Sequence, residues 1–138
     1  MLLNIDFTGI FIRGALLCLL ILLLYKNSVS QQNDYVVDIK YKVSGSMIAL
    51  SGTIDNNSSL PADFFYRFSV NKESSSGKSS TNQSGQMHLK ANSNTILTES
   101  TLDFSDDAVY RVSLIVETGN TTVADKLMEL KGSEIQKH

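Results

Sequence analysis

The chain of 138 residues has one cysteine, one proline and two histidines, and it lacks tryptophan. Cysteine and histidine are frequent nucleophiles and general bases in enzymes. The cysteine is Cys18, near the N-terminus, and His88 is the only histidine before the last eight residues. An imidazole-based site would therefore depend on one residue, which we expect to be a solvated histidine on a strand. We predict no enzymatic activity and no bound cofactor.

The chain also lacks a strong excess of charge. Its formal net charge is −2 at pH 7. Arg13, Lys26 and Asp6 lie within the first thirty residues, so the remainder carries ten basic and thirteen acidic side chains. Nucleic-acid-binding domains present a dense basic patch or stripe, and this mildly acidic segment has none. The sequence therefore gives no support for nucleic-acid binding.

A long hydrophobic run is missing as well. The apolar stretch Ala15 to Tyr25 has eleven residues, whereas a membrane-spanning helix needs roughly 20. A short apolar run followed by polar residues, with small Ser28 and Ser30 just before Gln31, is typical of a secretory signal peptide. We predict that residues 1–30 form such a peptide and are removed before Gln31. The alternative is an uncleaved N-terminal anchor.

Removal of this peptide would leave an exported domain without cysteine. Small secreted domains of eukaryotes usually depend on disulfides, so a disulfide-free exported domain favours a bacterial envelope and, within it, the periplasm. A lipid anchor at Cys18 would need a small residue before it, and Leu17 is bulky. We therefore expect no stable membrane insertion after cleavage, and the mature protein is expected to be a monomer or a weak dimer.

Hydrophobic and polar residues alternate through most of the segment 31–130. Val37, Ile39 and Tyr41, for example, are separated by Asp38 and Lys40. This period of two is typical of strands with one buried face. The predicted strands are Tyr35–Val43, Ile48–Ile54, Phe64–Asn71, Gln86–Ala91, Ile96–Phe104, Val109–Thr118 and Thr121–Leu130. Seven short strands and no helical period predict an all-β protein, a seven-stranded immunoglobulin-like β-sandwich.

Two segments lack this alternation. The stretch "KESSSGKSSTNQSG", residues 72–85, is polar and of low complexity, which indicates a flexible loop. The C-terminal "KGSEIQKH", residues 131–138, has no pattern, which indicates a flexible tail. The predicted domain therefore covers residues 31–130.

The stretch "DDAVYRVSLIV", residues 106–116, nearly spells the "D-x-A-x-Y-x-C" corner of an immunoglobulin domain. In such a corner the tyrosine hydroxyl bonds to upstream backbone, so we expect Tyr110 to hold the turn before its strand. Val112 stands where the disulfide cysteine would be. The domain also lacks the core tryptophan of antibody domains. We expect the core to depend on apolar burial instead, at about 25 cal/mol per Å². The predicted core residues are Tyr66, Phe68, Tyr110, Leu114 and Val116.

Three aspartates near the corner raise the question of a calcium site. Carboxylate oxygens are Ca²⁺ ligands, and Asp103, Asp106 and Asp107 lie close together in the sequence. Aspartates are also common turn formers. We interpret these three as turn residues and predict no metal site.

Strand alternation also predicts an exposed surface. If the strands containing Phe65, Arg111 and Leu127 share one sheet, its outer face is partly apolar and has two arginines. Such a contiguous set suggests a contact site; alternatively, the tail or a second copy covers it. The predicted outer-face residues are Phe65, Arg67, Val109, Arg111, Ile115, Val123 and Leu127. Further positive charge comes from Lys40, Lys42, Lys72 and Lys78, which could steer an anionic or polar partner.

The order "YRFSVNKESSSGKSSTNQSGQMHLKANSNTILTESTLDFSDDAVYRVSLIVETGN" closely resembles the small periplasmic curli-assembly proteins of the CsgC/CsgH type. The shared features are a strand, a Ser/Gly-rich segment with "QSG", a short strand before a turn, and an "L-x-x-S-x-D" approach to the next strand. The likeness covers about Ser59 to Leu130, together with the signal peptide. Some members carry Cys-x-Cys where Phe64 and Tyr66 stand here, so a redox role does not carry over.

This resemblance implies an immunoglobulin-like sandwich that keeps secreted curli-type amyloid subunits from polymerising before export. The expected function is therefore that of a periplasmic, chaperone-like inhibitor acting through transient surface contacts. The residues expected to bind the partner are Phe65, Arg67, Arg111, Ile115, Lys40 and Lys42. A structural or adhesive module of an envelope complex is the alternative, and a form tethered by the uncleaved apolar segment is a third.

Overall fold

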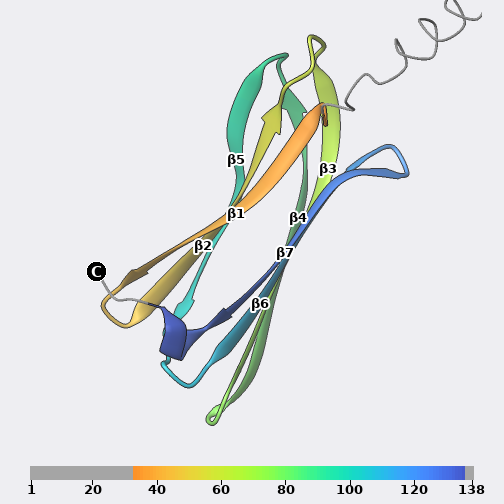
Figure 1. Cartoon of the computed structure of the whole chain (residues 1–138). Coiled ribbons are helices and arrows are strands. Elements are labelled where there is room, and N and C mark those ends of the chain that lie inside the picture. Colours follow the sequence, from red (N-terminus) through yellow and green to blue (C-terminus); the bar gives the residue numbers. More distant parts are fainter. Residues whose placement is uncertain (1–32, 136–138) are drawn as a thin grey trace, which may run out of the picture. The chain divides into compact units, whose positions relative to one another are not determined.

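The computed structural model describes residues 33–135, drawn in colour in Figure 1. The predicted signal peptide, residues 1–30, lies outside this range. The strands are β1 (Tyr35–Ser44), β2 (Met47–Asn56), β3 (Ala62–Ser74), β4 (Gly77–Leu89), β5 (Ser93–Asp103), β6 (Val109–Thr118) and β7 (Thr121–Lys131). A 3₁₀ turn, η1 (Gly132–Glu134), follows. Within these described residues, no helix has the length and apolar character needed to cross a membrane.

The strands form two antiparallel sheets. One has three strands in the order β1-β2-β5, and the other has four in the order β4-β3-β6-β7. The buried side chains lie on the faces that the two sheets turn toward each other, as the alternating sequence predicts. The expected all-β, seven-stranded sandwich is confirmed.

The core lies between the inner faces of the sheets. Val112, in the place of the disulfide cysteine, is 2% exposed and stands beside fully buried Val70 on β3. Phe68 and Leu114 are also a cross-strand pair in this core. Each such buried side chain contributes about 1.5–3 kcal/mol, so apolar packing occupies the place of the missing disulfide. The other large core residues are Val37, Ile39, Ile48, Leu50, Ile54, Phe64, Leu89, Leu97, Tyr110, Val116 and Ile135.

Tyr66, a predicted core residue, is only half-buried. Its cross-strand partner on β4 is Gly85. A Cβ atom added to Gly85 would lie 2.9 Å from Cε1 of the Tyr66 ring. The ring therefore covers the glycine, an arrangement that protects a flexible position in an edge strand.

The prediction that residues 72–85 form a flexible loop is wrong. β3 continues to Ser74, β4 begins at Gly77, and only Ser75 and Ser76 separate them. The backbone N–H of Ser75 donates to the Asp107 carboxylate at 2.9 Å, which attaches the hairpin tip to the β5–β6 connection. Polar composition was misleading because this hairpin exposes both of its faces near the tip, so neither face needs apolar residues.

The chain after β7 also differs from the expected flexible tail. Gly132 is buried, and its N–H donates to the carbonyl of Ala108 at 2.8 Å. Ile135 is 8% exposed and belongs to the core. The first part of the expected tail therefore packs onto the domain, while residues 136–138 lie outside the described range.

Candidate functional site

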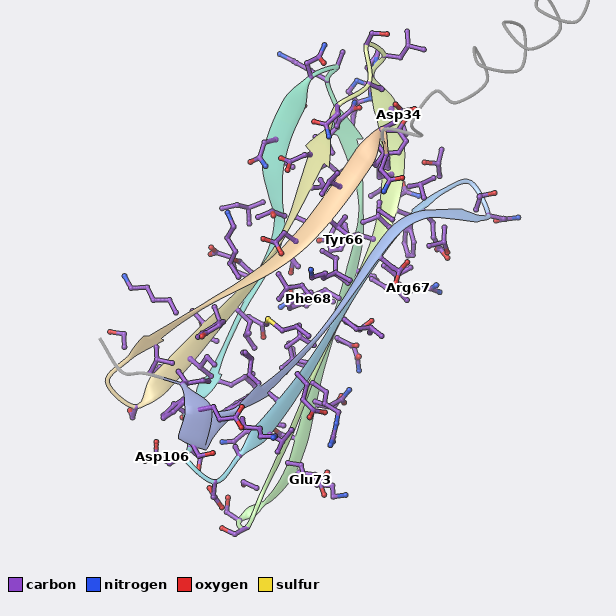
Figure 2. All side chains as sticks on the ribbon, viewed as in Figure 1. Asp34, Tyr66, Arg67, Phe68, Glu73 and Asp106 are labelled. Carbon is purple, nitrogen blue, oxygen red and sulfur yellow. The ribbon has the colours of Figure 1, made fainter. Side chains whose placement is uncertain are left out.

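The four-stranded sheet has an outer face on which four of the predicted contact residues meet. Its register pairs Arg67 on β3 with Ile115 on β6, and Phe65 with Glu117. Arg111 lies two rows further from Ile115 on the same face of β6. Cross-strand partners point to the same side of a sheet, so the structure brings Phe65, Arg67, Arg111 and Ile115 onto one surface. Figure 2 labels Arg67 on this sheet.

Between the two arginine rows runs a row of small side chains, Ser69 and Ser113, which are paired across β3 and β6. We call this depression the serine trough. A cavity of about 400 Å³ opens on its Arg67 side and includes Asn82 and Ser84 of β4. A second cavity, of about 350 Å³, opens toward Arg111 and Leu127. The trough therefore crosses the face from β4 to β7.

Leu127 and two acidic residues complete the walls of this face. Leu127, on β7 beside Ser113, is 75% exposed. Arg67 Nη2 lies 2.9 Å from Glu117 Oε1. Arg111 Nε lies 2.9 Å from Glu129 Oε2. Both arginines are thus paired with acids, and the face has no unbalanced positive charge around them.

Glu73 adds another acid beside Arg111, 3.5 Å from Nη1. It lies closer to Lys78, whose Nζ is 2.8 Å away. The hydrogen bond and charge of Lys78, followed by those of Arg111, lower the pKa of the Glu73 carboxyl. Exposed pairs of this kind contribute little to stability. They place the guanidinium of Arg111 between the carboxylates of Glu73 and Glu129.

The four predicted lysines are divided between the two sides of the sandwich. Lys40 and Lys42 are exposed on the outer face of the β1-β2-β5 sheet, on the other side of the sandwich. Among the described residues, neither has a salt-bridge partner within 4.0 Å. Lys72 instead donates to the carbonyl of Asp103 at 2.9 Å, and Lys78 pairs with Glu73. The structure therefore separates Lys40 and Lys42, which we call the lysine surface, from the outer face that carries Arg67 and Arg111, which we call the arginine face. Lys78 belongs to the arginine face, because it shares Glu73 with Arg111.

The expected position of Val123 on the outer face is wrong. The β6–β7 register shifts between Val116 and Glu117, so that Ala124 and Thr122 are their partners and Val123 is the extra residue. Val123 packs against the core instead. A bulge of this kind turns the following side chains over, and simple alternation cannot locate it.

The sequence alone did not identify the two acidic partners of the arginines or the two serines of the serine trough. Glu117 and Glu129 could be matched to their arginines only with the β3–β6–β7 register in hand. The serines did carry a signal, because Ser69 and Ser113 are small residues in the outward phase of two central strands.

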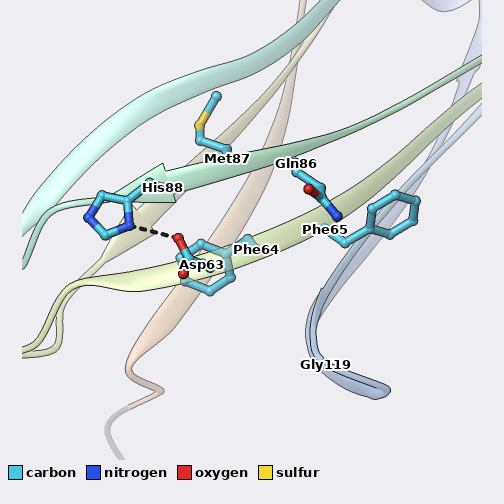
Figure 3. Close-up of a pocket in the computed structure, with 7 residues that line it drawn as sticks. All are labelled: Asp63, Phe64, Phe65, Gln86, Met87, His88 and Gly119. Carbon is cyan, nitrogen blue, oxygen red and sulfur yellow. Dashed lines mark hydrogen bonds and ion pairs between the residues drawn. The ribbon is translucent and has the colours of Figure 1, made fainter.

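A further cavity of about 420 Å³ lies where β3 and β4 approach the β6–β7 turn, shown in Figure 3. His88 on β4 is exposed, and its Nδ1 lies 2.7 Å from Oδ1 of Asp63 on β3. Phe65 and Gln86 line the same cavity, and Gly119 belongs to the β6–β7 turn at its border. The dyad consists of one imidazole and one carboxylate, both at the surface.

The aspartates of the corner make hydrogen bonds typical of turns. Asp107 accepts hydrogen bonds from the Ser105 hydroxyl and from the N–H of Ser75. These bonds, with that of Ser105 first, hold the pKa of the Asp107 carboxyl well below its usual range. Across residues 33–135, no three His, Cys, Asp or Glu side chains are grouped so as to hold a metal ion.

Comparison with known proteins identifies a family. The CsgH protein family matches residues 36–127, about two thirds of the chain. The fold is similar to the solution structure of R. palustris CsgH, with a TM-score of 0.56 and 23% identity over 75% of this chain and 99% of that one. It is also similar to the E. coli curli protein CsgC, with a TM-score of 0.58 and 20% identity over 67% and 96% of the two chains.

At these identities the two structures show a shared fold. A comparison with curated protein sequences gives no match. The family match covers more than half of the chain, and it includes β3, β4 and β6, which form most of the arginine face. The chain therefore belongs to the CsgH family.

Proposed function

We propose that this protein is a periplasmic, chaperone-like inhibitor that delays the polymerisation of secreted curli-type amyloid subunits through transient contacts. Membership of the CsgH family supports a curli-related role, since the structurally similar E. coli protein is a curli protein. The predicted signal peptide supports export. Inhibition of this kind needs a binding surface and no chemical step, which fits the absence of a predicted catalytic group.

The observation that carries the proposal is the serine trough between two guanidinium groups. Amyloid-forming segments are extended and often rich in Asn and Gln, whose side-chain amides both donate and accept hydrogen bonds. Each guanidinium has five N–H donors, and the bonds of Arg67 to Glu117 and of Arg111 to Glu129 and Glu73 engage only some of them.

Apolar residues beside the trough give the face a second kind of contact. Ile115 borders the cavity on the Arg67 side, and Leu127 borders the one on the Arg111 side. Phe65 lies next to Arg67 in the outward phase of β3. A segment lying across the face would therefore meet hydrogen-bond donors and apolar side chains together, a combination suited to brief contacts with many polar sequences.

The experiment compares two double variants on opposite sides of the sandwich. Arg67→Gln with Arg111→Gln alters the arginine face, and Lys40→Gln with Lys42→Gln removes the same charge from the other sheet. Glutamine is used because glutamate would place like charges beside Glu117 and Glu129. Both variants should keep the circular dichroism spectrum and melting temperature of the parent, because all four substituted side chains are at the surface.

The readout is the lag before a purified curli-type subunit forms fibres, measured with substoichiometric mature protein. We expect the parent and the lysine variant to lengthen the lag and the arginine variant to lose most of this effect. The reverse ranking would assign inhibition to the lysine surface. A folded parent that leaves the lag unchanged would overturn the inhibitor proposal and favour a structural or adhesive module.

A further inference from the structure

We propose that the free edge of β4 pairs with an extended segment of the client, which is then added as a further strand of the four-stranded sheet. The inference rests on the proposed function for the client's identity. It adds the kind of client segment that the β4 edge would recognise, which is an uncharged strand rich in Ser, Asn and Gln. β4 is the end strand of its sheet and has β3 on its other side.

Two of the other edge strands carry features that discourage such pairing. β1 has exposed Lys40 and Lys42. β7 has Asp125, Lys126 and Glu129, and its pairing with β6 contains a bulge. Charged side chains and bulges are the usual means by which proteins keep foreign strands away from an edge.

The edge of β5 is already engaged by a side chain of β4. Gln83 Nε2 donates to the backbone carbonyl of Glu99 at 3.1 Å. The Thr98 hydroxyl donates to Oε1 of the same glutamine. The Gln83 amide therefore caps the middle of β5.

β4 itself has none of these protections over most of its length. Ser79 to Met87 are nine residues without charge or proline, and the pairing of β4 with β3 is regular from end to end. Ser79 and Ser80 point to opposite faces and are both exposed. This part of the strand is therefore open to solvent on both faces, near the tip of the long β3–β4 hairpin drawn in Figure 1.

The β4 edge is also continuous with the serine trough. Asn82 and Ser84 line the trough cavity, and Gln86 follows in the same outward phase of β4. Stacked strands gain stability when Asn and Gln side chains align as ladders. A client strand rich in these residues would form such ladders with Asn82 and Gln86. It would also place no charged side chain beside this edge, which has none of its own to pair with it. The same client could then contact the edge and the trough.

The first test is backbone amide hydrogen exchange of the mature protein. It is measured alone, with a monomeric curli-type subunit, and with a short synthetic peptide that alternates Asn, Gln and Ser. We expect slower exchange at alternate amides between Ser79 and Gln86 with either probe. Unchanged exchange in β4, or slowing confined to β1 or β7, would overturn the edge inference. The peptide measurement does not depend on fibre inhibition, so the two proposals can fail separately.

The second test uses Ser80→Pro and Thr81→Pro. Neighbouring residues in an antiparallel pair direct their N–H groups alternately toward the partner strand and away from it. One proline should therefore lower the melting temperature, while the other should remove only an edge donor.

We expect the proline variant that keeps the parent's melting temperature to need roughly tenfold more protein for the same lag. Ser80→Ala and Thr81→Ala keep the N–H groups and should inhibit like the parent. A folded proline variant that inhibits as well as its alanine control would contradict edge pairing. If both proline variants unfold, the exchange measurement decides the question.

Discussion

The Tyr110 hydroxyl oxygen accepts a hydrogen bond from the backbone N–H of Ser105, five residues upstream, at 2.9 Å. The same hydroxyl donates to the carbonyl of Asp103 at 3.1 Å. The Tyr110 ring is fully buried and stacks on Phe104, with ring centroids 6.4 Å apart. Burial raises the pKa of the hydroxyl, so it stays protonated and can donate. One side chain thus closes the connection between β5 and β6.

We predict that Tyr110→Phe lowers the free energy of unfolding by about 1–2 kcal/mol, because the N–H of Ser105 and the carbonyl of Asp103 lose their partner in a partly buried place. Equilibrium denaturation measures the change. Tyr41→Phe is the matched control, since Tyr41 is 45% exposed and should leave the midpoint unchanged. Equal midpoints for the parent and Tyr110→Phe would show that the hydroxyl does not hold the corner.

Gly132 gives a second stability prediction. A Cβ atom there would lie 2.1 Å from the backbone oxygen of Ser105 and 3.0 Å from the backbone of Asp106. Backbone cannot move aside as a flexible side chain can, so Gly132→Ala should cost about 1–3 kcal/mol, the usual range for overpacking. Thermal and chemical denaturation should both show the loss. Ser133→Ala, at the next and exposed position, should not. A parent-like Gly132→Ala would mean that η1 is not anchored against the corner.

The pH dependence of stability should reveal Asp107. Hydrogen bonds from Ser105 and Ser75 lower the pKa of its carboxyl in the folded state below the ordinary value of 3.8. A lowered folded-state pKa stabilises the fold above the ordinary value, and this contribution is lost as the pH falls toward the folded-state value. The parent should therefore be more stable than Asp107→Asn near neutral pH, and the difference should shrink below about pH 4.

Ser105→Ala tests the cause of this pH effect, since it removes the first of the donors to Asp107. It should weaken the pH dependence while keeping the carboxylate. Urea denaturation at several pH values measures all three proteins. Parallel stability curves for the parent and Asp107→Asn across the acid range would contradict the assignment.

The sequence predicted the seven strands and the sandwich because both depend on local alternation. Tyr110 lies at the β5–β6 corner and Val112 lies in the core. The corner was inferred from the "D-x-A-x-Y" motif, and the inward direction of both side chains follows from the phase of one strand. The β3–β4 hairpin was missed because its residues have the polarity of a loop. Pairing with β3 and the bond from Ser75 to Asp107 define it, and these are long-range contacts.

The candidate site was predictable only in part for the same reason. Phase alone places Arg67 and Ile115 on an outer face. Their alignment, the pairing of Arg67 with Glu117 and the inward position of Val123 depend on register and on one bulge. Registers are set by contacts between distant segments, so the charge balance of the face could not be obtained from composition.

That charge balance leads to a prediction about salt. Raised ionic strength screens exposed charges beyond about 8–10 Å, and it should weaken inhibition strongly if free lysine charges attract the client. Arg67 and Arg111 are already paired with Glu117 and Glu129, so contacts made by their remaining N–H donors should change little. The parent's effect on the lag, corrected for the effect of salt on the subunit alone, should therefore fall by less than about twofold between low and physiological salt. The Lys40→Gln and Lys42→Gln double variant should show the same shallow dependence. A steep loss in the parent that disappears in this lysine variant would contradict the prediction and move the contact site to the β1-β2-β5 sheet.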